Sequence, residues 1–122
     1  MRIPSDRKAA AFSALAKLGS PRLIEQMLAK AKDSYADSVD REDALVDLCR
    51  LNATNQIKAI APLLDDTSPI VFERMPPGRE WRICDRAADT IAGLLAWRQR
   101  LRVFSAADER DAFVARVKQS MP

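Results

Sequence analysis

Apolar residues recur along most of the chain at spacings of three and four residues, the period of amphipathic helices. Gly19 is placed to end the first such run, and Ser20-Pro21 is a typical start for the next. No segment alternates with period two over a strand's length, except weakly at 70–72. The pattern therefore predicts an all-α fold, with apolar helical stripes at 11–18, 23–31, 44–51, 57–64, 81–95 and 113–117.

Polar residues and prolines indicate where several of these helices begin or bend. Asp40 is expected to begin the third helix, and Thr54 the fourth. Pro62 should kink the fourth helix or mark its last turns, because proline cannot donate a backbone hydrogen bond. The segment 105–108, Ser-Ala-Ala-Asp, resembles a capping box for the last helix.

The helical pattern repeats along the chain. Shifted by 33 residues, the first helix falls on the third, with Leu15 on Leu48 and Gly19 on Asn52. Shifted by 43 residues, the third helix falls on the fifth, with Leu48 on Ile91. Three similar helix pairs in tandem are typical of an α-solenoid, whereas a plain helical bundle would explain the helices but not the repetition.

Several of these residues resemble the HEAT and armadillo class of helical repeats. Leu63–Val71 is similar to that family's turn, Arg7-x-x-Ala10 and Arg41-x-x-Ala44 to the opening of its second helix, and Arg86–Leu94 to that helix's body. The third unit departs from the pattern, with Cys84 at the arginine position and extra residues at 72–80. The resemblance implies one domain over 1–122, a short right-handed α-solenoid of about three antiparallel helix pairs, acting as adaptor, scaffold or regulator.

Composition excludes several kinds of chemistry. The 122 residues are 48% hydrophobic and 30% charged, as in one soluble globular domain, and include no histidine. Ser-His-Asp and Cys-His catalysis are therefore impossible, and Cys49 and Cys84 are too few for a zinc site. Without a phosphate-binding glycine motif, we expect no enzyme, no cofactor and no metal. The absence of a leader or apolar span predicts a cytoplasmic protein with packed, reduced thiols and no membrane contact.

Charge is distributed unevenly. Residues 33–47 carry six acids against Arg41 alone, whereas 73–102 carry seven arginines, four acids and both tryptophans. Arginine makes bidentate bonds with carboxylates and phosphates, so this second segment suits a partner surface. Ion pairing within one helix is the simpler explanation for Arg82, Asp85, Arg86 and Asp89. The candidate partner-binding residues are Arg74, Arg79, Trp97, Arg98, Arg100 and Arg102.

These candidates lie in two segments, an inserted loop at 66–80 and a basic connector at 97–105 before the last helix. Phe72 and Met75 could anchor a partner or cover the end of the core, and the sequence leaves open which segment binds. The best-supported function is a non-enzymatic protein-binding module. Nucleic-acid binding through the arginine-rich segment is the alternative, and an enzyme accessory subunit is the second alternative.

Overall fold

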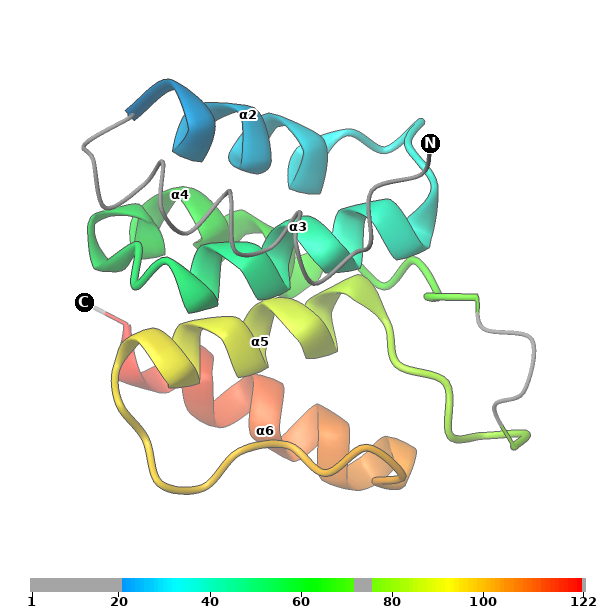
Figure 1. Cartoon of the computed structure of the whole chain (residues 1–122). Coiled ribbons are helices and arrows are strands. Elements are labelled where there is room, and N and C mark those ends of the chain that lie inside the picture. Colours follow the sequence, from blue (N-terminus) through cyan, green and yellow to red (C-terminus); the bar gives the residue numbers. More distant parts are fainter. Residues whose placement is uncertain (1–20, 72–75, 122) are drawn as a thin grey trace.

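The computed structural model describes residues 21–71 and 76–121 (Figure 1). Predictions on the first helix, with Leu15 and the Arg7-x-x-Ala10 motif, lie outside the described residues, as do those on Phe72, Arg74 and Met75. The helices within the described ranges are α2 (Pro21–Lys32), α3 (Ser38–Arg50), η1 (Thr54–Gln56), α4 (Ile57–Ile60), η2 (Ala61–Asp65), α5 (Ile83–Leu94) and α6 (Ala107–Ser120).

The described part of the chain forms no β-strand, which confirms the all-α class. The weak strand signal at 70–72 corresponds to an isolated bridge between Pro69 and Arg82, where the Ile70 N–H also donates to the Trp81 carbonyl at 2.8 Å. This bridge holds the segment after η2 against the start of α5.

Two predicted helix starts were wrong, whereas the fourth helix starts at Thr54 and is irregular around Pro62, as predicted. The fourth helix is broken into η1, α4 and η2, with Pro62 in the first turn of η2, where its missing N–H costs nothing. Helix α3 begins at Ser38 because the Asp37 carboxylate accepts the Val39 N–H at 2.9 Å. No side chain caps α6, because the Ser105 hydroxyl donates instead to the Arg102 carbonyl at 2.7 Å.

Helices α2, α3 and α5 are stacked in that order, and α6 packs on the other side of α5 (Figure 1). η2 also packs on α5, so this helix lies at the centre of the fold. Leu48 of α3 and Ile91 of α5 are both fully buried, as their equivalent positions in the repeat predict. Other large side chains that are fully buried in the core are Leu45, Ile60, Ile70, Ile83 and Val117.

The ends of α3 and α5 have the same geometry. Asn52 and Ala96 both adopt left-handed backbone conformations, with φ of 52° and 59°. The residue after each donates its N–H to a carbonyl five residues back, Ala53 to Leu48 at 3.1 Å and Trp97 to Ala92 at 2.9 Å. This is the Schellman pattern of helix termination. The two caps are 44 residues apart, one more than the 43-residue offset of the sequence alignment.

A second local structure recurs at the 33-residue offset. The Asp33 and Asp66 carboxylates each accept a backbone N–H two residues ahead, from Tyr35 and Ser68, both at 2.9 Å. Asp66 also pairs with Arg41 of α3 at 2.6 Å. Burial alone would raise the pKa of Asp66, but the hydrogen bonds from Ser68 and Arg41 outweigh it and the pKa is lowered. The turn after η2 is thereby tied to α3.

Candidate partner-binding surface

The α5–α6 connector, residues 95–106, crosses the molecule from the end of α5 to the start of α6 (Figure 1). It carries three large apolar side chains that face solvent: Leu95 at 40% exposure where it begins and, near its other end, the neighbours Val103 at 60% and Phe104 at 64%. Arg102, next to them, is also exposed, and so is Arg98 earlier in the connector. An aliphatic and an aromatic side chain on a charged surface mark this connector as a candidate binding site.

The first half of the connector is fixed by a buried carboxylate of α5. The Asp89 carboxylate accepts hydrogen bonds from Nε and Nη2 of Arg100, both at 2.9 Å, and from the backbone N–H of Leu101 at 3.0 Å. These bidentate bonds to Asp89 raise the pKa of Arg100 above its usual value. The guanidinium of Arg100 is therefore already paired within the chain.

Gly93 provides the space in which Arg100 crosses α5. A Cβ at this position would lie 2.6 Å from Arg100 Nη1 and 2.6 Å from the Cys49 Sγ. Both distances are far below van der Waals contact, so a side chain at this position would require the Arg100 guanidinium and the Cys49 thiol to shift. The absence of a side chain at Gly93 thus leaves room for Arg100 to reach Asp89.

Trp97 contributes to the core and to the surface at once. It is half-buried, and its ring meets Phe113 of α6 edge-on, with centroids 6.0 Å apart and an interplanar angle of 79°. The Arg116 guanidinium lies 5.2 Å from the centroid of the Trp97 ring. This packing joins the start of the connector to α6.

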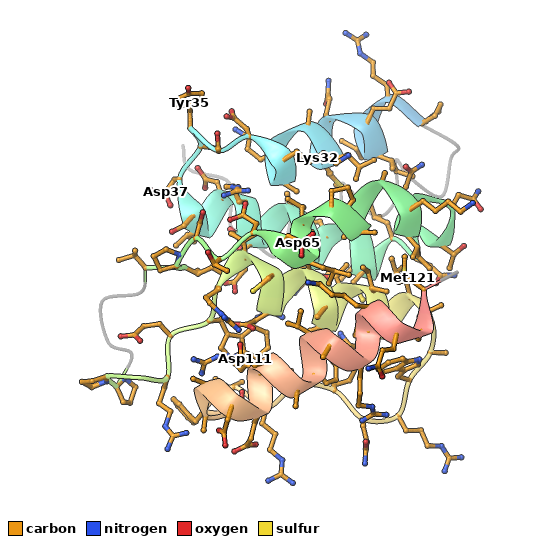
Figure 2. The ribbon with its side chains drawn as sticks, turned by 180° about the vertical axis from the view of Figure 1, so that it is seen from behind. Lys32, Tyr35, Asp37, Asp65, Asp111 and Met121 are labelled. Atoms are coloured by element: carbon orange, nitrogen blue, oxygen red, sulfur yellow. The ribbon has the colours of Figure 1, made fainter. Side chains whose placement is uncertain are left out.

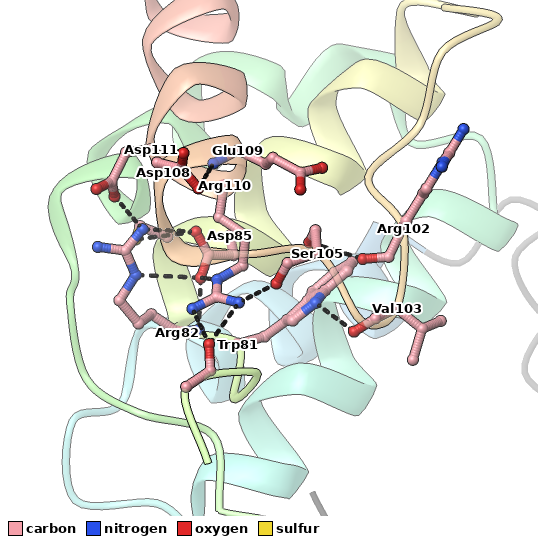
Figure 3. Close-up of polar contacts among 12 residues, drawn as sticks. Trp81, Arg82, Asp85, Arg102, Val103, Ser105, Asp108, Glu109, Arg110 and Asp111 are labelled. Atoms are coloured by element: carbon pink, nitrogen blue, oxygen red, sulfur yellow. Dashed lines mark hydrogen bonds and ion pairs between the residues drawn. The ribbon is translucent and has the colours of Figure 1, made fainter. Parts of the chain in front are cut away.

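The second half of the connector is held through its backbone. The buried Trp81 indole donates to the Val103 carbonyl at 3.1 Å, and the Arg102 carbonyl accepts the Ser105 N–H at 3.1 Å (Figure 3). The side chains of Val103 and Phe104 make the exposed face, while these bonds fix the chain that carries them. The connector therefore presents its apolar residues from a fixed backbone.

A buried charge cluster lies behind this half of the connector (Figure 3). The fully buried Asp85 accepts the Arg82 backbone N–H at 2.7 Å and the Arg82 Nη2 at 2.8 Å. Arg82 also pairs with Asp111 of α6 at 2.6 Å, and Arg110 Nε lies 3.3 Å from Asp85 Oδ2. The pKa of Arg82 is raised mainly by its hydrogen bond with Asp85. Two arginines and two carboxylates thus balance one another.

Arg110 brings the inserted loop and the connector together. Its Nη1 donates to the Ser105 carbonyl at 2.5 Å, and its Nη2 donates to the Gly78 carbonyl at 3.4 Å. The turn at Gly78 therefore lies beside the end of the connector, and half-buried Arg79 follows it directly. We call Arg79, Arg102, Val103 and Phe104 the connector surface.

The predicted site residues separate into groups. Arg79 and Arg102 belong to the connector surface, and Arg98 is exposed at the other end of the connector. Arg100 is paired with Asp89, and Trp97 packs on Phe113. The helix ion pairs expected within α5 are present between Arg82 and Asp85 and between Arg86 and Asp89, with both carboxylates buried.

Sequence reasoning missed Val103, Phe104 and Arg110. The two apolar residues fall between the helical stripes 81–95 and 113–117, and this position in the sequence indicates that they lie outside the core. Arg110 had no such signal, because nothing in its neighbourhood distinguishes a buried arginine from the exposed charges of α6.

Three further features of the described residues concern membrane insertion, metal binding and thiol chemistry. No helix among them is long and apolar enough to cross a membrane, and no group of three or more His, Cys, Asp or Glu could hold a metal ion. Cys49 and Cys84 are both free thiols. Burial, with the nearby Asp85 charge, raises the pKa of Cys84 to about 11, so this thiol stays protonated at neutral pH.

No family model matches the chain, and neither a curated protein nor a solved structure matches it.

Proposed function

We propose that this chain is a non-enzymatic protein-binding module built as a short right-handed α-solenoid of HEAT type. The recurring aspartate turns, the matching caps of α3 and α5, and the Arg41–Asp66 pair support the repeat architecture. Arg41 and Asp66 are two of the residues on which the resemblance to HEAT repeats rests. Stacked helix pairs provide extended binding surfaces and carry no chemistry of their own.

The observation that carries the binding function is the exposure of Val103 and Phe104 on a fixed backbone. A large aromatic side chain left in solvent gives no folding energy, yet its burial by a partner is favourable. The carbonyls of Arg102, Val103 and Ser105 all accept hydrogen bonds within the chain. Little conformational entropy is then lost when a partner covers this surface, which favours binding.

The chemistry of the surface defines its partner. The exposed Val103 and Phe104 suit an apolar pocket, and Arg102 beside them suits carboxylates at the rim of that pocket. Arg79, next to the Gly78 carbonyl that Arg110 binds, adds a second positive charge. The partner we propose is therefore a protein with an apolar pocket bordered by acidic residues.

Two findings favour this partner over a nucleic acid. Arg100, one of the arginines on which the nucleic-acid alternative depended, is neutralised by Asp89. The exposed acids Asp108 and Glu109 at the start of α6 would repel a phosphate backbone near Ser105. Binding to nucleic acid is one outcome of the experiment below.

The test is site-specific photo-cross-linking. A photoreactive phenylalanine analogue replaces Phe104 in one variant and Tyr35, a more exposed aromatic residue on another connector, in the control. In cells that express the chain, we expect one discrete protein adduct at position 104, lost in the Arg102→Glu variant and absent at position 35. The captured protein, once identified and purified, should bind the unmodified chain directly in a titration.

Two results would contradict the proposal. An adduct at position 104 that nuclease digestion removes would assign the surface to nucleic acid. Equal adducts at positions 35 and 104, or failure of the purified protein to bind, would show that Phe104 has no specific partner.

A further inference from the structure

We infer that Arg110 is a positioning residue, which holds the turn at Gly78 and Arg79 and the α5–α6 connector together as one binding surface. The inference rests on the proposed function, and it joins two segments that the sequence presented as alternative sites. Arg110 itself is 4% exposed and faces inward, so it acts through the residues it holds rather than by touching a partner.

The guanidinium of Arg110 connects two backbone segments 27 residues apart, since it binds the carbonyls of Gly78 and Ser105. Each of these residues adjoins a residue of the connector surface, half-buried Arg79 in one case and exposed Phe104 in the other. A planar group with several fixed donors can make both contacts at once, whereas a lysine ammonium on its flexible stem cannot reproduce that geometry.

The charge of Arg110 is held in place by Asp85. Arg110 Nε lies 3.3 Å from Asp85 Oδ2, and Asp85 is kept on this side of α5 by Arg82. Arg110 Nε is also the buried side-chain nitrogen that has no hydrogen-bond partner among the described residues. Asp85 thus holds Arg110 by charge, while the two Nη atoms are left to bind the backbone carbonyls.

Trp81 provides a second tie between the same two segments. It is 4% exposed at the end of the inserted loop, and its indole donates to the Val103 carbonyl at 3.1 Å. The Arg86 guanidinium lies 4.3 Å from the centroid of its ring and keeps the ring in place. Two ties, at Ser105 and Val103, fix the backbone on both sides of Phe104.

This arrangement has a consequence for binding. If the segments are locked together, a partner meets Arg79 and Phe104 in a fixed relation and loses little entropy in ordering them. If the lock is opened, the same side chains are still exposed, but the partner must order two independent segments. Loss of Arg110 should therefore weaken binding without changing any residue that touches the partner.

The experiment measures hydrogen exchange of the full chain with no partner present. The test variant is Arg110→Lys, which keeps the charge beside Asp85 but loses the planar guanidinium with its several donors. The matched control is Arg22→Lys, at an exposed position of α2 away from the connector. We expect Arg110→Lys to lower protection about tenfold or more at the Arg79 and Ser105 amides and at the Trp81 indole N–H, which corresponds to about 1.4 kcal/mol. The Asp33–Tyr35 turn and the control variant should be unchanged.

Unchanged exchange in Arg110→Lys, or loosening of only one segment, would overturn the inference. If Arg110→Lys does not fold, Arg110→Gln takes its place, because glutamine keeps an amide donor on a shorter side chain and cannot reach both carbonyls. It should speed exchange at Ser105, and no change there would overturn the inference equally.

A titration with the protein captured at position 104 separates this inference from the proposed function. Arg110→Lys should weaken binding about tenfold, while Arg22→Lys binds as the unmodified chain does. Equal affinity of the two variants would show that Arg110 does not position the surface, even though the surface itself binds. If no protein is captured at position 104, the proposed binding function is contradicted. The hydrogen-exchange result still decides whether Arg110 holds the two segments together.

Discussion

The two connectors that join long helices differ in what holds them. The α2–α3 connector, residues 33–37, is acidic and is closed by its own residues, since Asp33 accepts the Tyr35 N–H and the Asp33 carbonyl accepts the Ala36 N–H. The α5–α6 connector is held by Asp89, Trp81 and Arg110, which lie outside it. Each exposes one aromatic residue, Tyr35 at 97% and Phe104 at 64%.

The difference shows that the exposure of an aromatic side chain does not by itself identify a binding surface. Tyr35 projects from the molecule at a turn that needs no other support (Figure 2), so a polar aromatic residue there is an ordinary surface feature. Phe104 has no polar group, and three buried side chains fix the backbone around it. We infer that fixed support of an exposed apolar residue, rather than exposure, distinguishes a binding surface from a turn.

The largest expected effect comes from breaking the support of the α5–α6 connector at its buried charge. Asp85→Asn leaves Arg110 without its counter-charge inside the protein, which should cost about 3–5 kcal/mol of unfolding free energy. The matched control is Asp111→Asn, which removes an exposed partner of Arg82 and should cost less than about 1 kcal/mol. Denaturant unfolding measures both variants, and equal losses would contradict the role assigned to the buried cluster.

A smaller effect separates two arginines of the same connector. Arg100→Ala removes a bidentate bond to a buried carboxylate, which should cost about 1.5–3 kcal/mol. Arg98→Ala removes an exposed arginine and should change stability by less than about 0.5 kcal/mol. Thermal or denaturant unfolding of the two variants provides the comparison. Similar values would mean that the Arg100–Asp89 pair does not anchor the connector.

The smallest effect concerns the strain where the connector begins. Ala96 has a Cβ in the left-handed region, so Ala96→Gly should stabilise the chain by about 1 kcal/mol. Asn52→Gly at the equivalent cap of α3 should gain less, because asparagine tolerates this conformation. Chemical denaturation of both variants tests the comparison, and a loss of stability in Ala96→Gly would show that the cap is not strained.

Much of the fold could be predicted because it depends on local pattern. Helical spacing placed Leu48 and Ile91 in the core, and the repeat anticipated that they would be equivalent. The break of the fourth helix at Pro62 was foreseen only as a kink, because the number of residues that continue beyond a proline depends on packing against α5. Asp37 rather than Asp40 caps α3, a choice between nearby acids that sequence spacing alone does not determine.

The candidate site was harder to predict because tertiary contacts create it. Arg98, Arg100 and Arg102 occupy every second position, and the sequence gives no reason to expect that they differ in their contacts. Only the fold shows that Arg100 crosses Gly93 to reach Asp89. Arg110 and Gly78 are close in space, but no pattern in the sequence indicates that they are in contact. Composition located the basic segment, while burial and pairing decided which of its residues remain available.

The comparison of the two exposed aromatic residues provides the most direct test of the account. Phe104→Ala and Tyr35→Ala are each titrated with the purified protein captured at position 104. We predict that Phe104→Ala raises the Kd about tenfold or more, because a central aromatic anchor contributes about 2 kcal/mol or more, whereas Tyr35→Ala changes it less than about twofold. Equal effects of the two substitutions, or no effect of Phe104→Ala, would contradict the claim that the α5–α6 connector is the binding surface.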